Sequence, residues 1–183
     1  GHRVLADWER AGLLETVITQ NIDGLHQEAG SRNVIELHGT ARYVACLECG
    51  QRHPADPWVQ QFLDTDRVPD CPHCGGIMKH ATISFGQALD PVVLQRAAEV
   101  STQADVFFAL GSSLVVHPAA GLPQLAKRNG ARLIIINRTP TDQDRLADVV
   151  FHESIGETLS EIDRALDRTY PLPLRAPTRM VVN

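Results

Sequence analysis

The chain has 183 residues, a formal net charge of −5, and a hydrophobic fraction of 43%. These values are typical of one globular domain, or of one domain with a small insertion. The acidic balance argues against general nucleic-acid binding, which needs a basic surface. No run approaches the roughly 18 apolar residues of a membrane span. We therefore expect no direct nucleic-acid partner, no membrane partner and, without a signal-peptide pattern, a cytoplasmic location.

Strand and helix patterns alternate along most of the chain, which indicates a doubly wound α/β fold with a parallel sheet. Apolar and β-branched segments predict five strands, at 13–19, 81–86, 105–110, 132–136 and 147–151, and a short extended piece at 34–37. Apolar residues at helical spacing predict helices at 1–12, 25–29, 91–101, 118–127 and 155–166.

Polar residues directly follow the first predicted strand. Gln20, Asn21 and Asp23 come after the apolar segment, and Gly24 lets the backbone turn away. In an open α/β sheet the ligand crevice lies outside the carboxyl ends of the strands, so these side chains can orient a polar ligand there. The alternative is an Asx-type turn, in which the side chains bond their own backbone. Two later strand ends leave the same two alternatives open, at Gly111-Ser112-Ser113 and at Asn137-Arg138.

A single histidine, His38, stands between Leu37 and Gly39, after a short extended segment. An imidazole exchanges a proton near neutral pH, so this residue is a candidate general base for a hydroxyl. The alternative is a histidine that is buried and hydrogen-bonded for structural reasons.

The four cysteines form two Cys-x-x-Cys pairs, Cys46 with Cys49 and Cys71 with Cys74. Such a spacing predicts a tetrahedral zinc site, with two disulfides or a redox pair as the alternatives. Four thiolates leave no open coordination position, so this zinc would be structural. The proline-rich segment 40–79 cannot bury much core by itself, and we interpret it as an inserted zinc ribbon.

Several motifs occur together in a fixed order. They are Thr19-Gln20-Asn21-Ile22-Asp23-Gly24-Leu25-His26, Glu36-Leu37-His38-Gly39, the two cysteine pairs, Ser84-Phe85-Gly86, Gly111-Ser112-Ser113-Leu114 and Ile136-Asn137. In this order and spacing the chain resembles the sirtuins, the NAD-dependent protein lysine deacylases, up to about residue 165. The resemblance implies a Rossmann-like domain at 1–39 and 80–168, a zinc-binding module at 40–79 and an extended tail at 169–183.

The resemblance also implies that part of the sirtuin domain is missing from this sequence. Sirtuins place a Gly-Ala-Gly-x-Ser turn and a Pro-Asp-Phe-Arg segment before the part that matches here, and neither is present. The missing N-terminal strand would lie in the middle of the sheet. We therefore expect a doubly wound parallel sheet of five strands that lacks its central member and has exposed edges there.

By motif position, the resemblance assigns His38 as the catalytic base, with Asn21 and Asp23 beside it at the nicotinamide ribose. The residues expected to bind NAD are Gln20, Asn21, Ile22, Asp23, Gly111, Ser112, Ser113, Asn137, Arg138, Thr139 and Ile155. The segment Ile83-Ser84-Phe85-Gly86 is expected to bind the acylated-lysine peptide by strand addition. Zinc would be held by Cys46, Cys49, Cys71 and Cys74.

The implied reaction consumes NAD as a co-substrate and yields nicotinamide, deacylated lysine and O-acyl-ADP-ribose. Two other functions compete with it. Mono-ADP-ribosyl transfer would use the same NAD site with a different acceptor. An inactive binding module built from a zinc ribbon and an α/β domain would need no polar groups at the strand ends, so His38, Asn21 and Asp23 argue against it.

Overall fold

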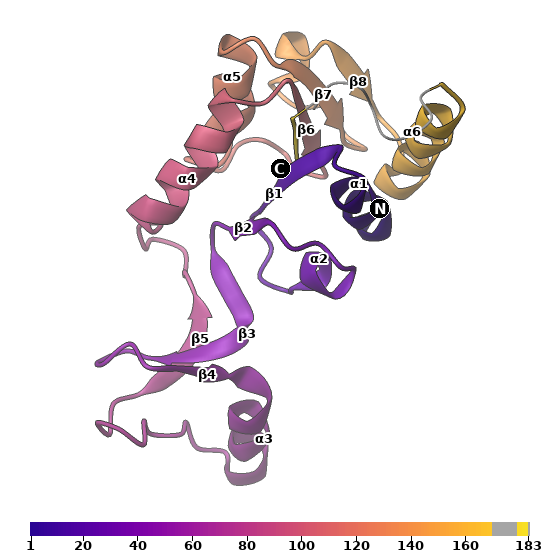
Figure 1. The fold of residues 1–183 in the computed structure, drawn as a ribbon. Coiled ribbons are helices and arrows are strands. Elements are labelled where there is room, and N and C mark those ends of the chain that lie inside the picture. Colours follow the sequence, from indigo (N-terminus) through magenta and orange to yellow (C-terminus); the bar gives the residue numbers. More distant parts are fainter. Residues whose placement is uncertain (170–178, 183) are drawn as a thin grey trace. The chain divides into compact units, whose positions relative to one another are not determined.

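The computed structural model describes residues 1–169 and 179–182, and the chain divides into two compact units (Figure 1). The first unit comprises Gly1–Gln20, Leu25–Leu37 and the described residues from Asp90 onward. The second comprises Asn21–Gly24 and His38–Leu89. Among the described residues, no helix is both long enough and apolar enough to span a membrane.

The first unit is built on a six-stranded sheet in which every neighbouring pair is parallel. The strand order is β2-β1-β9-β6-β7-β8. It differs from the 3-2-1-4-5-6 order of a doubly wound nucleotide-binding sheet in one respect: the last strand of the chain, β9, takes the central place that the first strand has in that order. This confirms the predicted doubly wound α/β class, but the expectation of five strands without a central member is wrong, because the described sheet has six strands. The elements are α1 (His2–Arg10), β1 (Leu14–Thr19), α2 (Leu25–Glu28), β2 (Val34–Glu36), α4 (Pro91–Thr102), β6 (Val106–Leu110), α5 (Gly121–Arg128), β7 (Arg132–Ile136), the 3-10 helix η1 (Asp144–Leu146), β8 (Val149–Phe151), α6 (Ile155–Thr169) and β9 (Met180–Val182).

The central position of this sheet is occupied by β9, from the C-terminal end of the chain. Val182 lies opposite Val17 of β1 on one side and Phe108 of β6 on the other. Met180, Val181 and Val182 are only 8%, 0% and 2% exposed, because a central strand of a parallel sheet is covered on both faces. The prediction of an extended tail at 169–183 is therefore wrong for these three residues, and wrong for Thr169, which ends α6. Residues 170–178 and 183 lie outside the described residues.

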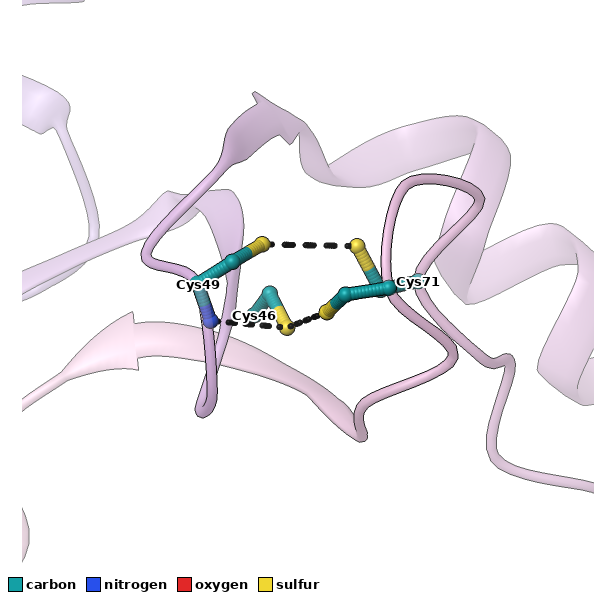
Figure 2. A group of neighbouring side chains, drawn as sticks. Cys46, Cys49 and Cys71 are labelled. Atoms are coloured by element: carbon teal, nitrogen blue, oxygen red, sulfur yellow. Dashed lines mark hydrogen bonds between the residues drawn. The ribbon is translucent and has the colours of Figure 1, made fainter.

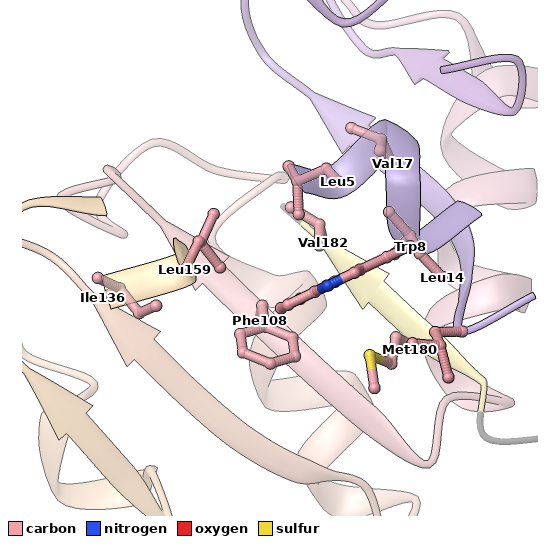
Figure 3. Packing of buried hydrophobic residues seen from close by; sticks show 10 residues of the cluster. Leu5, Trp8, Leu14, Val17, Phe108, Ile136, Leu159, Met180 and Val182 are labelled. Carbon is pink, nitrogen blue, oxygen red and sulfur yellow. The ribbon is translucent and has the colours of Figure 1, made fainter. Parts of the chain in front are cut away.

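The core of the first unit joins α1, α6 and the middle of the sheet (Figure 3). Trp8 is its largest buried side chain, and its ring lies 5.9 Å from that of Phe108. The indole N–H donates a 2.7 Å hydrogen bond to Asp163 of α6, so the one polar atom of the ring keeps a partner inside the packing. The buried members are Leu5, Trp8, Leu13, Leu14, Val17, Phe108, Ile136, Leu159, Met180 and Val182.

The second unit is a three-stranded antiparallel sheet, in the order β4-β3-β5, with one helix. It is larger than the predicted module at 40–79, because it also contains residues 21–24, 38–39 and 80–89. The strand predicted at 81–86 begins earlier and ends at Thr82, because Phe85 and Gly86 form a turn in which Gly86 has a φ of +85°. The elements are β3 (Gly39–Cys46), β4 (Arg52–Pro54), α3 (Ala55–Thr65) and β5 (Met78–Thr82).

Asp148 connects three parts of the first unit through its carboxylate. It accepts hydrogen bonds from Lys127 Nζ at 2.6 Å, Arg132 at 3.1 Å and the Leu133 amide at 2.8 Å. The Lys127 ammonium, followed by the Leu133 amide, holds the pKa of this carboxyl well below its ordinary value. The carboxylate therefore stabilises the fold above pH 3.8, and this stabilisation is lost as the pH falls toward the lowered pKa.

We expect Asp148→Asn to lower the melting temperature near neutral pH by a few degrees, and to lower it less in acid below pH 3.8. Thermal unfolding followed by circular dichroism at both pH values measures the difference. Asp142→Asn is the matched control, because Asp142 is exposed and lies on the same connection between β7 and β8. If Asp148→Asn lowered the melting temperature equally at the two pH values, the lowered pKa of the Asp148 carboxyl would be contradicted.

Candidate functional site

The second unit holds a cluster of four cysteine sulfurs, from two loops that face each other (Figure 2). All four Sγ atoms lie within 4.8 Å of one another, with Cys46–Cys74 at 3.5 Å and Cys49–Cys71 at 3.7 Å. Zn–S bonds of about 2.3 Å in a tetrahedron separate the sulfurs by about 3.8 Å, so the cluster fits a zinc ion. The same distances exclude the two disulfides, whose S–S bond is about 2.05 Å.

The backbone around Cys46 favours its thiolate, the form that binds metal, whereas burial and the neighbouring thiols raise the pKa of Cys49 and of Cys74. The amides of Glu48 and Cys49 donate to Cys46 Sγ at 3.4 and 3.5 Å. The bond from the Cys49 amide is the largest influence on the Cys46 thiol and lowers its pKa to about 7, although burial opposes the shift. The predicted zinc ligands Cys46, Cys49, Cys71 and Cys74 are therefore brought together with suitable chemistry.

In the first unit, three predicted NAD-binding positions lie at the carboxyl edge of the sheet. Gln20 follows β1, Gly111 follows β6 and Asn137 follows β7. Gly111 has a φ of +60°, and its amide donates to Ile136 O at 2.9 Å. A Cβ on Gly111 would lie 2.8 Å from Ile155 Cδ1 and would displace the end of that side chain, and the positive φ itself favours glycine at this position. The edge is thus polar at the strand ends and apolar at Ile155.

The two loops beside Gly111 and Asn137 are held by their own hydrogen bonds. Asn137 Nδ2 donates to Thr139 O at 2.8 Å, which is the local turn considered as an alternative. Ser112 Oγ accepts the Leu114 amide at 3.2 Å. Arg138, Thr139 and Ser113 are exposed, so their side chains are accessible to a ligand.

The second unit contains the other predicted catalytic and NAD-binding residues. Ile22 O accepts the Ala41 amide at 2.9 Å, which fixes the segment 21–24 against the start of β3. His38 is half-buried, and its carbonyl accepts the Ile83 amide at 2.8 Å. Gly24 lies so close to the Arg42 side chain that a Cβ would overlap it. Asn21, Ile22 and Asp23 thus belong to the same compact unit as His38, and they are exposed.

The segment expected to bind the peptide, residues 83–86, is a turn after β5 and not the end of a strand. Gln87 Oε1 accepts the Ser84 amide at 2.7 Å and closes this turn. Phe85 is fully exposed at its tip. The hydrogen bond between His38 and Ile83 places the segment next to the predicted base within one unit.

Sequence reasoning missed three polar residues that support the loops at the edge of the first unit. They are Gln143, which is only 3% exposed, and the pair Asp144 and His152, whose side chains contact each other. None of them belongs to a quoted motif or follows a strand of its own. Gln143 stands in the polar segment Thr-Asp-Gln-Asp, and from the sequence alone its buried side-chain amide could not be distinguished from an exposed one.

The six-stranded doubly wound sheet and the separate four-cysteine cluster define an α/β protein of the nucleotide-binding class with a zinc-ribbon module. The model of the Sir2 family matches residues 1–118. The NAD-dependent protein deacetylase 1 of Bradyrhizobium diazoefficiens is 54% identical over 161 residues, which is 87% of this chain and 63% of that protein. The NAD-dependent protein deacetylase 1 of Geobacillus kaustophilus is 48% identical over 172 residues, 93% of this chain and 68% of that protein.

Solved structures agree with these relatives. A Sir2 protein in complex with a p53 peptide and NAD+ has a TM-score of 0.81 and 37% identity, covering 91% of this chain and 68% of that one. A Sir2 protein bound to a propionylated peptide has a TM-score of 0.83 and 37% identity, covering 91% of this chain and 69% of that one. The chain belongs to the Sir2 family, and it spans 63% and 68% of the two curated relatives named above.

Proposed function

We propose that this chain carries the catalytic residues of an NAD-dependent protein lysine deacylase. The observation that carries the proposal is the hydrogen bond between His38 O and the Ile83 amide, which joins the candidate base to the candidate peptide segment. The similar proteins named as NAD-dependent deacetylases, and the Sir2 structures with NAD+ and a propionylated peptide, support the same activity.

The reaction removes the acyl group from lysine and consumes NAD. The acyl carbonyl oxygen forms a bond to C1′ of the nicotinamide ribose as the bond to nicotinamide breaks. His38 then takes the proton of a ribose hydroxyl, whose oxygen attacks the acyl carbon. With one water consumed, the products are nicotinamide, free lysine and O-acyl-ADP-ribose. Asn21 and Asp23 orient the nicotinamide ribose, with Ile22 between them.

The other residues bind rather than react. Gln20, Gly111, Ser112 and Ser113 contact the ribose and phosphate groups of NAD, and Asn137, Arg138, Thr139 and Ile155 contact the adenosine. Residues 83–86 bind the acylated peptide through main-chain hydrogen bonds, after the Ser84 amide is released from Gln87. The four cysteines hold a structural zinc that takes no part in the chemistry. Reduced cysteines suit the cytoplasm as the location.

The test is to incubate the zinc-loaded chain with NAD and an acetyl-lysine peptide, and to follow nicotinamide and peptide mass by mass spectrometry. We expect deacetylated peptide from the wild-type chain, and at least about a hundredfold less from His38→Ala, because proton transfer by the base is lost. His73→Ala is the control, since His73 is an exposed histidine of the same unit.

Two outcomes would contradict the proposal. A peptide that gains the mass of ADP-ribose, with no free lysine, would show mono-ADP-ribosyl transfer. No product from folded, zinc-loaded protein would show that the residues present in this chain do not suffice for the reaction.

A further inference from the structure

The side chain of Gln143 is buried between two main-chain carbonyls of the first unit. It is 3% exposed, and its Nε2 donates to Leu114 O at 3.2 Å and to Ala120 O at 2.8 Å. Because both partners are acceptors, only the amino group of the amide can face them, which fixes its orientation. Its Oε1 accepts no hydrogen bond from the residues that the structure describes.

The two carbonyls belong to the connection between β6 and α5, which we call the Ser112 loop (residues 111–120). The loop has a conformation that needs external support. Leu114 has a φ of +57°, an unfavourable value for a residue with a Cβ, although its side chain is buried. Such a conformation persists only where its surroundings determine it. Gln143 supplies that support, by bonding the carbonyl of Leu114 itself and the carbonyl at the end of the loop.

The next residue along the chain reaches the neighbouring loop. Asp144 accepts a 2.6 Å hydrogen bond from Thr141 Oγ1, and its second oxygen lies 3.4 Å from His152 Nε2. His152 Nδ1 is 3.0 Å from Asn137 O. Two adjacent residues at the start of η1 therefore hold the loop after β6 and the turn after β7, which are two of the proposed NAD-binding segments of the first unit.

We propose that Gln143 is the positioning residue for NAD in this chain: its two hydrogen bonds hold the Ser112 loop in the shape that binds the ADP-ribose part of the dinucleotide. Gln143 does not contact the ligand, and it acts through the main chain on either side of Ser112 and Ser113. The identity of the ligand rests on the proposed function. The support of the loop rests on the geometry alone.

The test compares Gln143→Met with the wild-type chain. Methionine has a similar length and no donors, so it removes the side-chain hydrogen bond from both carbonyls. We expect the amides from Leu114 to Ala120 to exchange hydrogen at least about tenfold faster, while those of β6 and β7 are unchanged. We also expect ADP-ribose to bind at least about tenfold more weakly in calorimetry, and the KM for NAD to rise more than kcat falls.

Two further variants sharpen the test. Gln143→Asn keeps the amide but is too short to reach both carbonyls. It should therefore also speed hydrogen exchange in the loop and weaken ADP-ribose binding, but less than Gln143→Met does. It replaces Gln143→Met in the test if that variant does not fold. Gln95→Met is the matched control, since Gln95 is an exposed glutamine on α4 of the same unit. It should match the wild type in every measurement.

The outcomes separate this inference from the proposed deacylase activity. Unchanged loop exchange in both Gln143 variants would overturn the positioning role. Faster exchange with unchanged ADP-ribose affinity, or no ADP-ribose binding by the wild-type chain, would overturn the link to NAD. Faster exchange with weaker ADP-ribose binding would support the inference even if no deacetylated peptide formed.

Discussion

Val181→Asp is expected to unfold the first unit. Val181 is fully buried and lies between β1 and β6, opposite Thr16 and Phe107. A carboxylate buried there without a partner costs several kcal/mol, which is comparable to the whole stability of about 5–15 kcal/mol of a typical domain. In the described sheet, β9 is also the strand that joins the pair β2-β1 to the group β6-β7-β8. Circular dichroism and hydrogen exchange of β1 and β6 would measure the loss.

Val149→Asp is the matched control for this prediction. Val149 lies on β8, the edge strand of the same sheet, and is 43% exposed, so an aspartate there keeps contact with water. The melting temperature of Val181→Ala should lie between those of Val181→Asp and Val149→Asp, because this variant removes buried methyl groups without adding a charge. Equal melting temperatures for Val181→Asp and Val149→Asp would show that the C-terminal strand is not part of the sheet.

Loss of zinc is expected to unfold the second unit while the first stays folded. The core of the second unit is small, and two of its five buried members, Cys46 and Cys71, are metal ligands. A structural zinc contributes on the order of 10–16 kcal/mol of binding free energy, which such a core cannot replace. Cys74→Ala tests this well, because Cys74 is exposed and its removal loses little packing. Native mass spectrometry reports the zinc, and hydrogen exchange of β3 and β5 reports the fold.

Cys74→His is the control for the zinc prediction. Histidine is a normal zinc ligand and Cys₃His sites are common, so this variant should keep the metal and the protected amides. A chelator added to the wild-type chain should reproduce the Cys74→Ala result, and added zinc should reverse it. A second unit that keeps its exchange protection after the zinc is removed would contradict the structural role.

The sequence by itself determined the class of the sheet and the metal site. The segments 105–110 and 132–136 are apolar after their first residue, and each forms a strand within one residue of its predicted bounds. A continuous apolar run bounded by polar residues is a local pattern, so the strand can be predicted from the sequence alone. The cysteine spacing is equally local, because two Cys-x-x-Cys turns already place their ligands in pairs.

Only the tertiary structure decided which segment fills the centre of the sheet. β9 has three residues, too few to show a period, and its partners Val17 and Phe108 lie far away along the chain. The same holds for Gln143, whose carbonyl partners are 29 and 23 residues away. The segment 21–24 belongs to the second unit and is bonded to it through the Ala41 amide, which is 19 residues from its partner Ile22, so the motif could be identified from the sequence but the unit that contains it could not. Pairings between distant segments depend on the packing of the whole chain, which local pattern does not encode.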